Sequence, residues 1–105
     1  MATQQNSTAT FQVLDAMDAP HGGRILRLRL VGGDPPALRT LKGSRVKAVS
    51  PEGDERFARV EGFPLFGGKA SDRRLARSGR LDVHVVEEAE GLPIACRWQV
   101  SGPVS

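Results

Sequence analysis

The chain has 105 residues, of which 39% are hydrophobic and 26% charged, and its formal net charge is +3. At about 100–200 residues per domain, this length predicts one domain, and the single cysteine excludes a disulfide-stabilised scaffold. No run approaches the roughly 20 apolar residues of a membrane helix. Because the first residues contain no basic, apolar leader, we expect a soluble cytoplasmic protein that does not bind membranes.

The charge is unevenly distributed along the chain. Residues 24–80 contain fourteen of the fifteen basic residues and six acidic ones, whereas residues 1–23 and 81–105 are net acidic. Such a basic middle predicts an anionic partner, since Lys and Arg contacts to phosphate release counterions and raise affinity. A solvated basic surface without any partner is the alternative interpretation.

The chain begins with small polar residues. Residues 1–9 cannot bury enough apolar surface to offset the entropy of ordering, which predicts a disordered tail. The folded domain is then expected over residues 10–102, with residues 103–105 as a C-terminal tail. A first strand is predicted over residues 11–17, and the Pro20–Gly23 segment ends it.

Residues 24–31 carry the clearest strand pattern. Leucines alternate with Arg27 and Arg29 at a period of two, so one face should be buried and the other charged. The Gly and Pro cluster at residues 32–36 ends this strand. Residues 37–42 fit either one helical turn or an extended link.

A β-hairpin is predicted next. Residues 44–49 and 56–63 form its strands, and the Pro51–Asp54 segment forms its turn, because Pro restricts φ and Gly accepts a positive φ. Arg45 and Lys47 are expected on the outward face of the first strand.

An irregular, Gly-rich segment and a short helix follow the hairpin. Three apolar residues of the segment are expected to plug one end of the core: Phe63, Leu65 and Phe66. Residues 71–77 predict a short helix with Ser71 or Asp72 as its N-cap and Gly79 as its end.

Two further strands complete the pattern, over residues 81–87 and 92–100, and Gly102–Pro103 is expected to stop the second. Four residues of this last strand should share one face: Ile94, Cys96, Trp98 and Val100. Six short strands with turn signals between them predict an all-β protein. We expect a small closed six-stranded β-barrel with one short helical turn, because closure removes unpaired strand edges.

The order of these pieces carries a family resemblance. The matching segments are Phe11–Asp18, Gly23–Gly33, Leu41–Val46, Arg59–Phe63 and Leu75–Val83. Over residues 11–86 the chain resembles the second domain, a small β-barrel, of translational GTPases such as elongation factor Tu. Arg80 stands where that family usually has an acid, and the GTPase domain is lacking. The resemblance implies a module that contacts RNA or protein partners.

No set of residues predicts catalysis, a metal or a cofactor. Cys96 is expected to be a small buried hydrophobe rather than a nucleophile, since reactive thiolates need basic and partly exposed surroundings. His21 and His84 are interpreted as two unrelated surface residues, because no pair has zinc-ligand spacing. The Gly67–Ser71 segment is not a P-loop, as Ala70 separates the lysine from the serine. We therefore expect a protein that is not an enzyme.

The candidate nucleic-acid-binding residues form two basic sets. The first lies on strands: Arg27, Arg29, Arg45 and Lys47. The second surrounds the predicted helix: Lys69, Arg73, Arg74, Arg77 and Arg80. Since like charges opposite one another destabilise paired strands, interleaved acids or a partner are expected, with Glu61 as the candidate acid. Phe63 and Phe66 are close in sequence to the second set but are expected in the core rather than stacked on bases.

Three function hypotheses remain open from the sequence. The leading one is a non-catalytic binding module, RNA- or ribosome-associated through its basic face, with RNA or an acidic protein as partner. The alternative is a protein-interaction or structural β-barrel domain that has no nucleic-acid partner. The third is a small-ligand or metal site at the histidine-containing turn.

Overall fold

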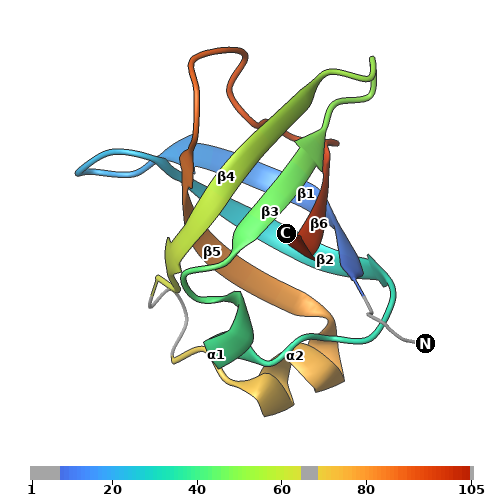
Figure 1. The fold of residues 1–105 in the computed structure, drawn as a ribbon. Helices are drawn as coiled ribbons and strands as arrows, with labels where there is room; N and C mark the ends of the chain where they lie inside the picture. The colour runs from blue at the N-terminus through green and yellow to red at the C-terminus, as the bar shows by residue number, and fades with distance from the viewer. Residues whose placement is uncertain (1–7, 65–68, 105) are drawn as a thin grey trace.

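The computed structural model describes residues 8–64 and 69–104. It confirms an all-β fold, a closed six-stranded barrel with strand order β1-β2-β5-β4-β3-β6 (Figure 1). The strands are β1 (Ala9–Asp18), β2 (Arg24–Gly32), β3 (Arg45–Val49), β4 (Glu55–Gly62), β5 (Arg80–Glu87) and β6 (Gln99–Val104). All neighbouring strands are antiparallel, and β6 closes the barrel by pairing with both β1 and β3.

Two short helices lie at one end of the barrel (Figure 1). They are α1 (Leu38–Leu41) and α2 (Asp72–Ser78), so the ambiguous segment 37–42 forms a helical turn. The Asp72 carboxylate joins them by accepting a hydrogen bond from the Leu38 amide at 2.7 Å. Leu41 of α1 and Leu75 of α2 are both buried in the hydrophobic core, and they thereby cover this end of the barrel.

The barrel core follows from the period-two alternation of its strands. Buried residues recur at every second position of the strands, and those of β2 and β5 include Leu26, Leu28, Val83 and Val85. Phe63, predicted to plug one end, is half-buried and packs against this core. Leu65 and Phe66, named with it in that prediction, lie outside the described residues.

The prediction of a strand over residues 92–100 is wrong. The strand begins at Gln99, and the preceding residues form the loop from β5. Arg97 has a φ of 73°, which is incompatible with a regular strand. Ile94 and Trp98 are nevertheless buried, because the loop folds over the core. Cys96 is exposed, with its Sγ 3.5 Å from the carbonyl oxygen of Leu14, so its predicted burial is also wrong.

The ends of the chain differ from the expected boundaries. β6 continues through Pro103 to Val104, which pairs with Arg45 of β3, so the strand does not stop at Gly102. Ala9 is fully buried and opens β1, so the predicted tail over residues 1–9 overlaps the barrel. Residues 1–7 of that predicted tail, and residue 105 of the predicted C-terminal tail, lie outside the described residues.

A buried arginine attaches the long β5–β6 loop to the barrel. The Arg56 side chain is only 9% exposed, and its guanidinium donates to the carbonyl oxygens of Leu92 and Ala89. Its Nη1 also lies 3.5 Å from a Glu87 carboxylate oxygen, which accepts a hydrogen bond from the Ile94 amide at 2.8 Å. Arg56 is therefore a structural residue and not part of an accessible basic surface.

We expect Trp98→Ala to lower the free energy of unfolding by about 3–5 kcal/mol, the range for truncating a buried aromatic. Trp98 is 5% exposed, whereas Leu92 in the same loop is 58% exposed. Leu92→Ala is the control and should change stability by at most about 0.5 kcal/mol. Urea unfolding measures both, and a loss below about 1 kcal/mol for Trp98→Ala would exclude a core role for this tryptophan.

We expect Arg56→Met to destabilise the fold by about 3 kcal/mol, because it leaves two carbonyl oxygens without their donor and Glu87 without its cationic partner. Arg59→Met, at an exposed position of the same strand, is the matched control and should have little effect. The comparison uses urea unfolding of both variants. Equal stabilities for the two would show that the loop does not depend on Arg56.

Candidate functional site

The helix α2 begins and ends at the residues predicted from the sequence, and one buried leucine orients it on the barrel. The Ser71 hydroxyl is the N-cap and accepts a hydrogen bond from the Arg74 amide at 3.1 Å. Gly79 ends the helix in the left-handed conformation, with a φ of 70°, as predicted. Leu75 is the buried residue of the helix, so the arginines on its other faces are exposed.

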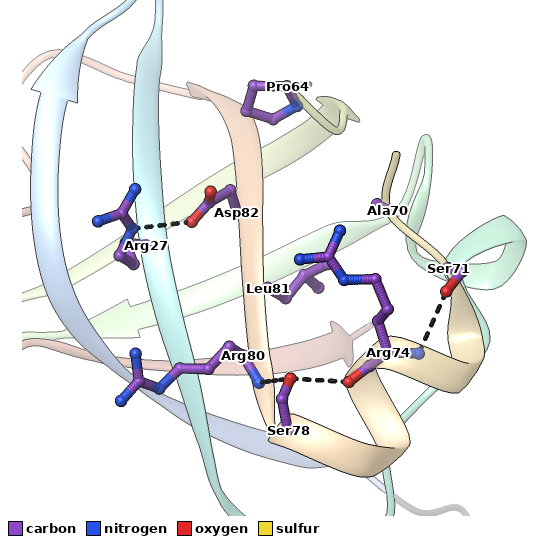
Figure 2. Close-up of a pocket in the computed structure, with 9 residues that line it drawn as sticks. All are labelled: Arg27, Pro64, Ala70, Ser71, Arg74, Ser78, Arg80, Leu81 and Asp82. Carbon is purple, nitrogen blue, oxygen red and sulfur yellow. Dashed lines mark hydrogen bonds and ion pairs between the residues drawn. The ribbon is translucent and has the colours of Figure 1, made fainter. Parts of the chain in front are cut away.

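A cleft of about 250 Å³ lies where α2 meets the outer face of β2 and β5. Figure 2 shows the residues that line it: Arg27, Pro64, Ala70, Ser71, Arg74, Ser78, Arg80, Leu81 and Asp82. We call it the arginine cleft. It brings Arg27 of β2 together with Arg74 of α2 and Arg80 of β5, which are distant from β2 in sequence.

Positive charge prevails in the arginine cleft. Its lining contains three guanidinium groups and one carboxylate. Arg27 Nε lies 3.2 Å from Asp82 Oδ1, and Arg74 Nη1 donates to the carbonyl oxygen of Lys69 at 3.4 Å. Within residues 8–64 and 69–104, the Arg80 guanidinium forms no ion pair; only the backbone amide of Arg80 is held, by the Ser78 hydroxyl at 3.0 Å.

A fourth arginine, Arg29, lies beside the arginine cleft. Arg29 of β2 and Arg80 of β5 are direct cross-strand partners, and both are exposed. Arg29 reaches only the Gln12 side chain, at 3.4 Å, among the residues that the structure describes. Like charges in such a pair disfavour the strand pairing, and a bound anion would relieve their repulsion.

The remaining residues of the helical basic set lie on α2 or just before it and do not line the cleft. Arg73 and Arg77 are exposed and are one helical turn apart on α2, so they share a face adjacent to that of Arg74. Lys69 is exposed and contributes its backbone carbonyl to Arg74. The structure thus brings two residues of the predicted set, Arg74 and Arg80, together in one cleft.

The strand set, in contrast, is divided between two sides of the barrel. Arg45 and Lys47 lie on β3, which is three strands from β2 in the closed order. Arg45 makes hydrogen bonds of 2.8 and 2.9 Å to Glu88 and lies 3.8 Å over the Phe57 ring. Lys47 Nζ is 3.3 Å from Glu55. These two cations are thus separate from the arginine cleft.

Acidic side chains largely neutralise the β3 side. Hydrogen bonding to Arg45 is the main cause of a lowered pKa of Glu88, so this carboxylate stays ionised at neutral pH. The interleaved acids expected from the sequence are therefore present. They are Glu88, Glu55 and Asp82, and Glu61, the predicted candidate, is in none of the ion pairs of the described residues.

Both histidines border a second cleft, of about 350 Å³. We call it the histidine cleft. The residues that line it are Ala19, Pro20, His21, Ile25, Gly62, Phe63, Pro64 and His84. His84 Nε2 lies 2.8 Å from the carbonyl oxygen of Gly22. The sequence did not predict this proximity, which arises because the pairing of β2 with β5 brings His84 to the turn that contains His21.

No protein-family model, curated protein or solved structure matches this chain. Across residues 8–64 and 69–104, no three or more His, Cys, Asp or Glu side chains are grouped so that they could hold a metal ion. None of the helices in the described part has the length and apolar character needed to cross a membrane. The geometry of the two clefts is therefore the basis for assigning a function.

We expect Gly79→Ala to lower the free energy of unfolding by about 1 kcal/mol, because an alanine resists the left-handed conformation of this helix end. A Cβ at Gly79 would meet Leu30 only at 3.8 Å, so backbone strain rather than collision is the cause. Gly62→Ala is the control, since Gly62 has no such φ and a Cβ there would meet no atom within 4 Å. Thermal unfolding of both variants tests this, and equal midpoints would contradict it.

Proposed function

We propose that this protein is a non-catalytic binding module that contacts RNA in the cytoplasm through the arginine cleft and the arginines beside it. The observation that carries the proposal is the cross-strand pair Arg29 and Arg80, next to a cleft with three guanidinium groups and one carboxylate. Arg29 and Arg80 place two positive charges opposite one another, an arrangement that disfavours the strand pairing. A phosphate group placed there would supply the missing negative charge.

The identity of the cations favours phosphate as the ligand group. Guanidinium groups present planar, bidentate donors that match phosphate oxygens, and they are weakly hydrated. The Ser71 and Ser78 hydroxyls of the arginine cleft add polar groups to its lining. A free carboxylate ligand would compete with Asp82 for the same arginines, but it offers fewer acceptor oxygens than a phosphodiester chain offers along its length.

The extent of the basic surface favours a polymer over a small anion. Arg73 and Arg77 are exposed on α2, Lys69 is exposed just before it, and Arg29 lies opposite Arg80 on β2. A chain of phosphates can contact several of these cations together, and each contact adds to affinity through counterion release. The resemblance to the second domain of translational GTPases implies RNA or protein partners, and between these the arginine-rich surface favours RNA.

We expect opposite effects from two substitutions in the arginine cleft. Arg80→Ala should weaken binding of a fluorescein-labelled RNA about tenfold and reduce the slope of log affinity against log salt by about 1. Asp82→Asn should strengthen binding, because it removes the one carboxylate among the described residues that line the cleft. Fluorescence anisotropy at several salt concentrations measures both effects.

Lys47→Ala is the matched control for this experiment. It also removes one positive charge, but on β3, where Glu55 already neutralises it. Its affinity should equal that of the unaltered protein. Equal losses for Lys47→Ala and Arg80→Ala would show that only net charge matters, and no binding of RNA at low salt would refute the proposed function in favour of a protein partner.

A further inference from the structure

We infer that the RNA bound by this protein is single-stranded, with an unpaired base in the histidine cleft and its neighbouring phosphates in the arginine cleft. This inference rests on the proposed function and adds to it the form of the RNA. It is carried by the continuity of the two clefts and by the different chemistry of their linings.

The two clefts are continuous along one strand. Arg80, Asp82 and His84 occupy alternate positions of β5, so their side chains point to the same outer face at intervals of about 6.6 Å. The first two line the arginine cleft and the third lines the histidine cleft. Pro64 lines both, and Figure 2 places it at the Asp82 end of the arginine cleft, opposite Ser78.

The lining of the histidine cleft suits a nucleobase rather than a phosphate. It contains the apolar side chains of Ile25, Phe63 and Pro64 together with the imidazole rings of His21 and His84, and it contains neither Lys nor Arg. Planar and apolar side chains of this kind stack on bases, while imidazole nitrogens can hydrogen-bond to base edges. The cations lie instead in the adjoining arginine cleft, where the phosphates would bind.

The wall of the histidine cleft is held in place before any ligand binds. The hydrogen bond between His84 Nε2 and the Gly22 carbonyl holds the β1–β2 turn against β5. At Gly23 the φ is 79°, and a Cβ there would lie 2.4 Å from the carbonyl oxygen of Val85, so the turn approaches β5 as closely as only glycine permits. A preformed cleft binds with a smaller loss of conformational entropy.

Only an unpaired base can enter such a cleft. In an RNA duplex the bases are stacked and paired inside the helix, and the protein would reach mainly phosphates and ribose hydroxyls. A duplex could therefore contact the arginine cleft but would leave the histidine cleft empty. A single strand contacts both clefts, which predicts that it binds more tightly than a duplex of equal length.

The test uses three fluorescein-labelled RNA probes of equal length and anisotropy at constant salt. The probes are a single strand of mixed sequence, the same strand annealed to its complement, and a single strand that carries abasic sites in place of its central bases. The unaltered protein should bind the first about tenfold more tightly than the abasic strand, since the abasic strand keeps the phosphates but lacks the stacked bases. It should also prefer the first strand to the duplex.

Single substitutions distinguish the contributions of the two clefts to RNA binding. His21→Ala should weaken binding of the intact single strand about tenfold and leave binding of the abasic strand unchanged. Arg80→Ala should weaken binding of both strands, and Lys47→Ala should weaken neither. Because His21 lies in an exposed turn, its substitution should preserve the fold, which the midpoint of thermal unfolding verifies.

The outcomes distinguish this inference from the proposed function. Equal affinities for the intact and abasic strands, or tighter binding of the duplex, would overturn the inference, although Arg80→Ala would still show that phosphates bind the arginine cleft. If no probe binds, both the proposed function and the inference are refuted. The comparison of intact and abasic strands needs only the unaltered protein, so it stands even if a variant fails to fold.

Discussion

The antiparallel pairing of β2 with β5 is the constraint on which both clefts depend. It joins strands that are separated in sequence by the β3–β4 hairpin and α2, and it places Arg29 opposite Arg80 and Ile25 opposite His84. The hydrogen bond from the Leu30 amide to the Gly79 carbonyl, at 2.7 Å, extends this pairing to the end of α2. A shift of register by one residue would turn the arginines and the histidine into the core, so burial of the apolar face maintains the geometry of the outer face.

The basic side chains on the two sides of the barrel differ in how far nearby acids neutralise them. On β3, Arg45 is bound to Glu88 and packs over Phe57, which makes it part of the protein's own surface network. On β2 and β5 the cations exceed the acids, and Arg29 lies opposite Arg80. The density of basic residues in the sequence is thus a poor guide to a binding surface, because the positions of the acids in space decide which cations remain available.

Loops illustrate how far alternating patterns can predict structure. The apolar residues Ile94 and Trp98 are buried as expected, yet they belong to a loop and not to a strand. The loop folds over the core and is held at both ends: Arg56 donates to the carbonyl oxygens of Leu92 and Ala89, and the Val13 amide of β1 donates to the Trp98 carbonyl oxygen. Pairing of backbone groups decides which residues form a strand. Cys96 lies between these two residues but is exposed, in a turn that continues into Arg97 with its φ of 73°.

The sequence by itself determined five of the six strands closely, the capped helix α2 between Ser71 and Gly79, and the barrel class. These features depend on local periodicity and on the conformational preferences of single residues. Only the tertiary structure decided that Arg27, Arg74 and Arg80 share a cleft, that Arg45 and Lys47 do not, and that His21 and His84 border the same cleft. The physical reason is that a period of two identifies the buried face of a strand but not its neighbours, which depend on how the whole barrel closes.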